Sequence, residues 1–124
     1  MVICQGDLWW ASLSLPKGSE PGLRRPVVVV QRDSINRSKF QTVLAVPLTT
    51  QTRHLNIPGN VLLKKGTGGL PKTSLVRCTH VMVIDKARLV EKIGTLPSDK
   101  TREIIQEIIW VLGGLGPAHS IHSP

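Results

Sequence analysis

The stretch Arg24-Arg25-Pro26-Val27-Val28-Val29-Val30 carries the clearest structural signal of this chain. An unbroken run of β-branched residues predicts a strand that is buried on both faces, and proline is tolerated at the first position of a strand but not in its middle. We therefore expect a core strand over residues 25–31, with two arginines at its entrance. A guanidinium group presents a planar fork of donors that fits phosphate oxygens. From these residues alone, however, a solvated arginine pair is the simpler interpretation.

Short apolar runs on both sides of this stretch predict the other strands. They lie over residues 7–13, 42–48, 59–63, 73–84 and 90–93. Polar segments rich in Gly, Pro, Ser and Asn separate them: a loop over 14–23, a connection without regular structure over 32–41, a loop over 49–54 and a turn over 64–69. Asp85 is expected to cap a single helical turn that runs through Leu89.

A helix is predicted to begin at Ser98, with Asp99 in its first turn, and to end at Gly113-Gly114. Its expected apolar face comprises Ile104, Ile105, Ile108, Ile109, Val111 and Leu112. The fold class is therefore mainly β with a C-terminal helix (α+β), in the form of a small antiparallel barrel on which the helix packs. We expect one domain over residues 1–113 and a flexible tail over 114–124.

The charge balance indicates an anionic partner. Sixteen Lys and Arg against eight Asp and Glu give a formal net charge of +8, which favours nucleic acid or an acidic protein. No stretch approaches the roughly 20 apolar residues of a membrane span, and the N-terminus lacks the features of a signal peptide. Cys4 and Cys78 stand alone, as is typical of reduced thiols, so we expect a cytoplasmic protein.

The usual enzyme motifs are missing from the sequence. There is no P-loop, no GxGxxG and no GxSxG, and the histidines and cysteines lack metal-ligand spacing, so we expect neither a metal nor a cofactor. The remaining polar groups are Thr49-Thr50-Gln51 after a strand, His80 near Arg77, and a loop with Lys17, Ser19 and Glu20. A lone histidine on a strand is more often structural than catalytic, and loops and turns often carry only surface polarity. Together these groups suit metal-free attack on a phosphodiester.

Several motifs, in order along the chain, resemble the MazF/PemK toxins of bacterial toxin–antitoxin pairs. They are Gly6-Asp7-x-x-Trp10, Gly18-Ser19-Glu20, Arg25-Pro26-Val27-Val28-Val29 and Val46-Pro47-Leu48-Thr49-Thr50, continuing through Arg77 to Ile84-Asp85-Lys86. The resemblance covers residues 2–113. It implies an SH3-like barrel of the MazF/Kid/CcdB type, usually a homodimer, that cuts single-stranded RNA at short sequences without a metal.

The resemblance also assigns roles to individual residues. The family's catalytic arginine and threonine fall on Arg25 and Thr49, and Ser19-Glu20 corresponds to the segment that closes over RNA. The Kid toxins rely instead on an Arg, an Asp and a His. Arg77 matches the first, but Thr79 and Ser19 replace the other two, so the Kid-type acid–base set is broken. His80 stands where relatives often carry Gln, which leaves its role open.

The resulting hypothesis is attack of an RNA 2′-hydroxyl on the adjacent phosphorus, giving a 2′,3′-cyclic phosphate and a 5′-hydroxyl. Arg25 stabilises the developing charge, Thr49 holds the phosphate or aligns the hydroxyl, and Glu20 or His80 is the candidate base. Further RNA contacts are expected from Lys17, Ser19, Arg24, Thr50, Gln51, Arg53, Arg77 and Thr79. Trp9 and Trp10 point to opposite faces of their strand, so at most one of them lines the groove.

The sequence leaves two alternative functions open and also predicts a protein partner. A CcdB-like gyrase poison has the same fold, but such a relative works through a Trp near its extreme C-terminus, whereas Trp110 lies within the helix. A passive basic RNA-binding barrel is the second alternative. The +8 charge predicts an acidic, MazE-like antitoxin whose disordered segment lies across the basic groove.

Overall fold

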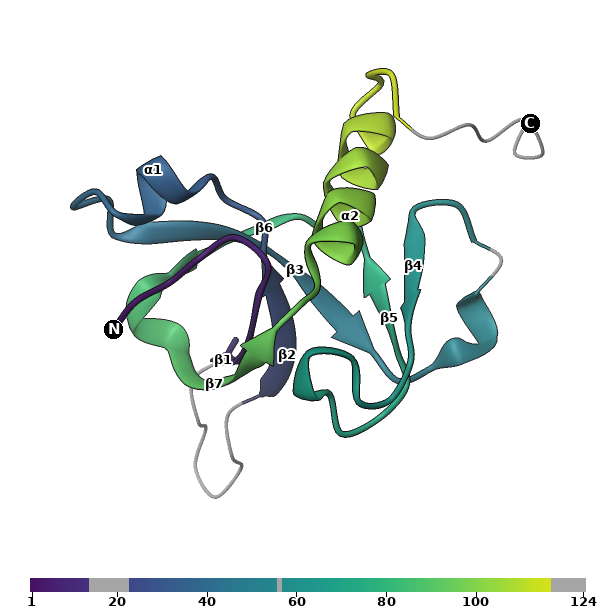
Figure 1. The fold of residues 1–124 in the computed structure, drawn as a ribbon, viewed down its shortest axis with the longest axis horizontal. Helices are drawn as coiled ribbons and strands as arrows, with labels where there is room; N and C mark the ends of the chain where they lie inside the picture. Colours follow the sequence, from purple (N-terminus) through teal and green to yellow (C-terminus); the bar gives the residue numbers. More distant parts are fainter. Residues whose placement is uncertain (14–22, 56, 117–124) are drawn as a thin grey trace.

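The computed structural model describes residues 1–13, 23–55 and 57–116. The strands are β1 (Asp7–Ser12), β2 (Arg24–Val29), β3 (Thr42–Thr49), β4 (Asn60–Leu63), β5 (Ser74–Arg77), β6 (Met82–Asp85) and β7 (Leu89–Thr95). The helices are α1 (Asp33–Asn36) and α2 (Ser98–Val111), with short 3-10 turns η1 (Thr52–His54), η2 (Thr67–Gly69) and η3 (Lys86–Arg88). Mainly antiparallel strands followed by a C-terminal helix confirm the predicted fold class (Figure 1).

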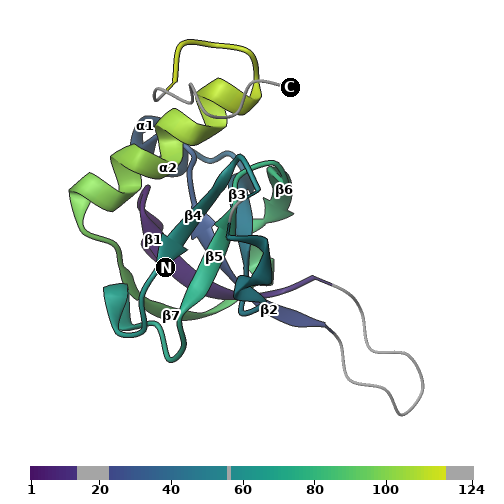
Figure 2. The same ribbon diagram turned by 90° about the vertical axis from the view of Figure 1, so that its right-hand side faces the viewer.

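The strands form one curled antiparallel sheet in the order β4-β5-β3-β2-β1-β7, with β6 pairing with β3. Strand β3 changes partner along its length. Thr42 to Ala45 pair with β6, whereas Leu48 and Thr49 pair with β5. Helix α2 lies across one side of this sheet, as Figures 1 and 2 both show. The sheet therefore packs against α2 through one apolar cluster, and a second apolar cluster contains residues such as Trp9 and Val27.

The valine run of β2 is buried on both faces, as predicted. Val28 belongs to the apolar cluster beneath α2, together with Leu8 and Ile104, whereas Val27 and Val29 belong to a second cluster. The strand begins at Arg24 rather than Arg25, so Pro26 is its third residue. Pro26 pairs with Trp10 in the β1–β2 ladder, but the β2–β3 ladder starts only at Val27, so the missing N–H falls outside the pairing with β3.

Helix α2 begins at Ser98 as predicted, and Gly113 follows it with a φ of +93°, which glycine adopts without strain. The predicted apolar face is too wide. Ile104 and Ile108 are buried, but Ile109 is 40% and Leu112 77% exposed. The sheet buries the face of the helix on which Ile104 and Ile108 lie, four residues apart. A sequence pattern does not show how wide this buried face is.

The connection over residues 32–41 contains the helical turn α1, so the prediction of no regular structure was wrong there. Two buried side-chain amides support this turn. Asn36 Nδ2 donates to the Gln31 carbonyl at 2.8 Å, and Gln31 Nε2 donates to Asn36 Oδ1 at 2.9 Å. This pairing depends on the fold of the whole segment, and the polar composition of the segment gave no sign of it.

Smaller differences concern the ends of elements. Strand β3 runs on to include Thr49, and the predicted loop that follows contains η1. The turn after Asp85 exists as η3, but the Asp85 side chain makes no capping hydrogen bond to it. Of the predicted tail, residues 117–124 lie outside the described residues.

Candidate functional site

Arg25 and Thr49 come from neighbouring antiparallel strands. The β2–β3 register pairs Val27 with Pro47, and continuing it by two residues sets Arg25 opposite Thr49. Two residues along a strand return to the same face, so the two side chains share one face of the sheet. Side chains at directly opposed positions lie within reach of one another.

Both residues line one open pocket with a volume of about 290 Å³. The rest of its lining consists of Leu23, Arg24, Pro26, Leu48, Thr50, Gln51 and Ser74. Five of the polar lining residues, Arg24, Arg25, Thr49, Thr50 and Gln51, are among the site residues predicted from the sequence. The described lining contains two cations and three hydroxyl groups but no carboxylate, which is a composition that suits an anion.

The hydroxyl group of Thr49 is held in place by the chain itself. Its Oγ1 accepts a hydrogen bond from the backbone N–H of Gln51 at 3.2 Å. The hydroxyl proton is therefore available to donate, for example to a phosphate oxygen. The Gln51 side chain accepts a hydrogen bond from Arg53 Nη2 at 3.2 Å, which links exposed Arg53 to the pocket wall.

Arg24 is arranged differently from Arg25. Its guanidinium carbon lies 5.8 Å from the centre of the Trp10 ring, and its Nη2 lies 3.7 Å from Glu91 Oε2. Trp9, by contrast, is 6% exposed and packs in the second apolar cluster. The two tryptophans are thus divided between core and surface, as the alternation along the strand predicted.

Ser74 is a pocket residue that the sequence interpretation missed. It is the first residue of β5, is 2% exposed, and its Oγ donates to the Lys72 carbonyl at 2.9 Å. It reaches the site because Leu75 pairs with Thr49 across β5 and β3. Nothing in the sequence around Ser74 indicated this pairing; only the order of the strands in the sheet does.

Arg77 is the last residue of β5, Thr79 and His80 follow the strand, and these three residues do not line the pocket. The register Leu48–Val76 sets half-buried Arg77 opposite Pro47, one diagonal step from Thr49 on the same face. Its Nε is buried without a hydrogen-bond partner within the part of the chain that the structure describes. Thr79 Oγ1 and His80 Nδ1, both exposed, are 2.8 Å apart.

The other predicted site residues, Lys17, Ser19 and Glu20, lie outside the described residues. Within the described ranges, no three His, Cys, Asp or Glu side chains gather closely enough to hold a metal ion. Neither α2 nor any other described helix is long and apolar enough to span a membrane.

Comparison with known proteins gives consistent results. The family model described as "PemK-like, MazF-like toxin of type II toxin-antitoxin system" matches residues 4–112. The chain is 38% identical over 112 residues to endoribonuclease MazF2 of Mycobacterium bovis and, equally, to endoribonuclease MazF6 of Mycobacterium tuberculosis, covering 90% of this chain and 98% of each relative. A crystal structure of MazE-MazF from Deinococcus radiodurans is similar at a TM-score of 0.75 and 25% identity, covering 91% of this chain and 97% of that one. The chain belongs to the PemK-like, MazF-like toxin family of type II toxin–antitoxin systems.

Proposed function

We propose that this chain is the endoribonuclease toxin of a toxin–antitoxin system and that it cuts single-stranded RNA at short sequences without a metal. Membership of the toxin family supports the toxin role. Relatives that are 38% identical over nearly their whole length are endoribonucleases, which supports the enzymatic activity. The observation that carries the proposed chemistry is the pocket shared by Arg25 and Thr49, in which a cation and an oriented hydroxyl group face the same space. In a cell, such cleavage is expected to destroy messenger RNA and thereby to inhibit translation and growth.

The proposed reaction is an internal transesterification. The RNA 2′-oxygen loses its proton and forms a bond to the adjacent phosphorus, while the bond from phosphorus to the 5′-oxygen of the next nucleotide breaks. That 5′-oxygen takes up a proton, so the products are a 2′,3′-cyclic phosphate and a 5′-hydroxyl end. Negative charge accumulates on the non-bridging phosphate oxygens in the transition state.

Arg25 is proposed to stabilise that charge. Arg25 is the second residue of a strand in which Val27, Val28 and Val29 are fully buried, so the guanidinium is carried by a rigid element. A preorganised donor at a developing oxyanion contributes roughly 3–4 kcal/mol. Thr49 is proposed to donate its hydroxyl proton to a phosphate oxygen or to align the attacking 2′-hydroxyl, because the Gln51 N–H already occupies one of its lone pairs.

The general base remains one of two candidates, Glu20 and His80. Glu20 lies outside the described residues. His80 is exposed, and Thr79 engages only its Nδ1, which leaves Nε2 for a substrate. A role for His80 predicts that His80→Ala alters the pH dependence of the cleavage rate, and an unchanged profile removes His80 from the chemistry.

Binding of RNA is proposed to use the basic and polar groups around the pocket. Arg24, Thr50 and Gln51 line it, and Arg53 contacts Gln51. Arg77, Thr79, Lys17 and Ser19 are proposed to extend the contact to flanking nucleotides. Affinity that depends on phosphate contacts falls steeply with salt concentration. Bases of single-stranded RNA would be splayed out and bound one by one between the loops.

The proposed partner is an acidic, MazE-like antitoxin, since the chain carries a net charge of +8 and a similar solved structure is a MazE-MazF complex. A flexible acidic segment that lies across the basic pocket would block RNA. We also propose a homodimer and a cytoplasmic location, both from family membership. A co-expressed acidic neighbour that neither binds nor relieves growth arrest would contradict the antitoxin proposal.

The test of the proposed function is cleavage of a long single-stranded RNA in EDTA by wild type, Arg25→Ala and Thr49→Ala. Cuts at one short sequence with 2′,3′-cyclic phosphate ends, lost in both variants, are the expected result. Folded wild type that leaves the RNA intact would contradict the proposal, and a gyrase assay would then test the CcdB-like alternative.

A further inference from the structure

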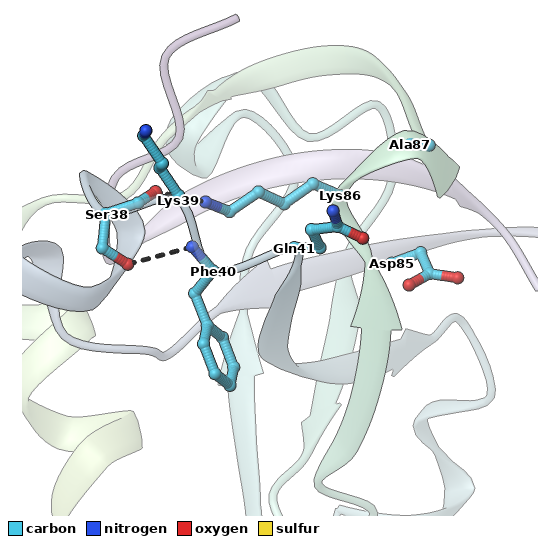
Figure 3. Close-up of a pocket in the computed structure, with 7 residues that line it drawn as sticks. All are labelled: Ser38, Lys39, Phe40, Gln41, Asp85, Lys86 and Ala87. Carbon is cyan, nitrogen blue, oxygen red and sulfur yellow. Dashed lines mark hydrogen bonds between the residues drawn. The ribbon is translucent and has the colours of Figure 1, made fainter.

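A second concave site lies at the opposite end of β3 from Thr49. It has a volume of about 550 Å³ and is lined by Ser38, Lys39, Phe40, Gln41, Asp85, Lys86 and Ala87 (Figure 3). Thr42, next to this site, is seven positions from Thr49 along β3, a span of roughly 23 Å in an extended strand. None of its lining residues belongs to the Arg25–Thr49 pocket.

Phe40 gives this site an exposed aromatic ring. It is 57% exposed although it is the only phenylalanine in a chain with no tyrosine. Its backbone is nevertheless fixed, because the Phe40 N–H donates to Ser38 Oγ at 3.1 Å and Ser38 Oγ donates to the Ile35 carbonyl at 2.6 Å. An aromatic ring that a rigid backbone holds in water is a surface on which a flat ligand can stack.

Lys86 fixes the other wall of the site. Its Nζ donates to the Asn36 carbonyl at 2.9 Å and to the Ser38 carbonyl at 3.4 Å, and its backbone N–H donates to the Gln41 carbonyl at 2.9 Å. Figure 3 shows this side chain reaching from η3 towards Ser38. These bonds join the Phe40 segment to the end of β6, so the site is formed before a ligand binds.

Gln41 and Asp85 supply the polar groups. Both are exposed, and within the described part of the chain neither side chain makes a hydrogen bond or an ion pair. Asp85 is carried by β6, where it pairs with Thr42 next to Gln41. An ionised carboxylate only accepts hydrogen bonds, so it selects a ligand with an N–H donor. Lys39, on the same segment, adds a positive charge for a phosphate.

From this arrangement we infer that the Phe40 site binds one unpaired RNA base with an exocyclic amino group, at a position several nucleotides from the cut. The base stacks on Phe40 and donates its amino group to Asp85. This inference rests on the proposed ribonuclease function, because it assumes that RNA is the ligand of this surface. An acidic peptide fits less well, since Asp85 would repel it and Lys86 is already bound to two carbonyls.

Cytosine and uracil provide a pair of probes of equal size, because position 4 carries an amino donor in cytosine and a carbonyl acceptor in uracil. The neighbouring N3 differs as well: it is an acceptor in cytosine and an N–H donor in uracil. The deoxy oligomers d(C)5 and d(U)5 lack the 2′-hydroxyl and cannot be cut. Titration of ¹⁵N-labelled protein with each gives the affinity from amide chemical shifts. We expect d(C)5 to shift the amides of Phe40, Gln41 and residues 85–87, with an affinity at least about fivefold higher than that of d(U)5.

Two variants separate stacking from base selection. Phe40→Ala should remove the shifts at residues 85–87 for both oligomers, and Asp85→Asn should bring the ratio of the two affinities close to one. Val90→Ala, an exposed apolar residue on β7, is the control and should change neither. Three outcomes would each overturn the inference. Wild type could bind the two oligomers with equal affinity, the shifts could be confined to residues 49–51, or pentaglutamate could bind more tightly than d(C)5.

RNA cleavage distinguishes failure of this inference from failure of the proposed function. In RNA cleavage, Phe40→Ala should act mainly by raising KM, because the Phe40 site binds RNA without touching the scissile phosphate, and the control Val90→Ala should change neither KM nor kcat. A large fall in kcat for Phe40→Ala would contradict a separate site. Wild type that cuts RNA but does not discriminate d(C)5 from d(U)5 keeps the ribonuclease function and rejects the second site.

Discussion

The guanidinium of Arg24 lies over the ring of Trp10, 5.8 Å from its centre, whereas the adjacent Arg25 lines the same pocket as Thr49 of the neighbouring strand. Two successive arginines on one strand therefore have different surroundings. Arg24 also lies near Glu91, so its charge is shared with a carboxylate and an aromatic ring. This difference makes the pair a matched internal comparison for the proposed chemistry.

Arg25→Ala should lower kcat by about 10²- to 10³-fold, the effect of removing one preorganised oxyanion donor. Arg24→Ala should mainly raise KM, with kcat changed less than about fivefold, because it removes a binding charge at the rim of the pocket. Steady-state cleavage of a fluorescent RNA separates the two effects. Equal losses of kcat in both variants would show that Arg25 has no special role.

Thr49 allows a test of the hydroxyl group itself. Thr49→Ser keeps the group that accepts from the Gln51 N–H and should retain kcat within about tenfold, whereas Thr49→Val should lose about 10²-fold or more. Both variants preserve much of the side-chain volume, and circular dichroism checks the fold. Comparable activity of the valine and serine variants would leave the hydroxyl without a role.

Ile104 and Ile109 test how α2 is held on the sheet. Ile104 is fully buried, so Ile104→Ala should lower the free energy of unfolding by about 2–5 kcal/mol through lost burial and a cavity. Ile109 is 40% exposed, and Ile109→Ala should lower it by less than about 1 kcal/mol. Urea unfolding of both variants measures the difference, provided that protein concentration is held constant. An equally large loss for Ile109→Ala would mean that its face is covered in solution.

Cys78 should make the folded state less stable in alkali. Burial, followed by the negative charges of Glu107 and Glu103, raises the pKa of its thiol to about 12 from the ordinary 9.0. Between these values the unfolded thiol loses its proton while the folded one keeps it, so the free energy of unfolding falls as pH rises above 9. The slope for one such group is about 1.4 kcal/mol per pH unit.

The measurement is the difference between wild type and Cys78→Ala in urea unfolding at pH 8, 9, 10 and 11. The substitution changes stability at every pH through packing, but only wild type should have the additional slope above pH 9. The other titrating groups are common to both proteins and cancel in the comparison. Parallel stability profiles over this range would contradict a raised pKa for Cys78.

Where the sequence predicted the structure well, the evidence was local. The run Val27–Val28–Val29 specified a strand buried on both faces, because consecutive β-branched residues favour a buried strand without reference to distant parts of the chain. Ser98 and Gly113 bounded α2 correctly, because helix ends depend on the residues next to them. The division of Trp9 from Trp10 followed from the two-residue period of a strand.

Where prediction failed, the deciding contacts were remote. Ser74 entered the site through the pairing of β5 with β3, which joins segments about 25 residues apart. The helical turn α1 depends on the buried amide pair of Gln31 and Asn36. The extent of the buried stripe on α2 depends on which part of the helix the sheet covers, and Leu112 lies outside that part.

By itself, the sequence determined most of the elements of this protein, its basic character and, through ordered motifs, the family, and it named Arg25 and Thr49 as candidate site residues. These properties depend on hydrophobic periodicity, helix-capping residues and residue identity, which are all local features of the sequence. The sequence did not show that the predicted strand over 73–84 is two strands, β5 and β6. Only the tertiary structure decided that Arg25, Thr49 and Ser74 line one pocket and that Phe40 and Asp85 line another. Each of these depends on strand order and register, which long-range pairing sets and no local pattern contains.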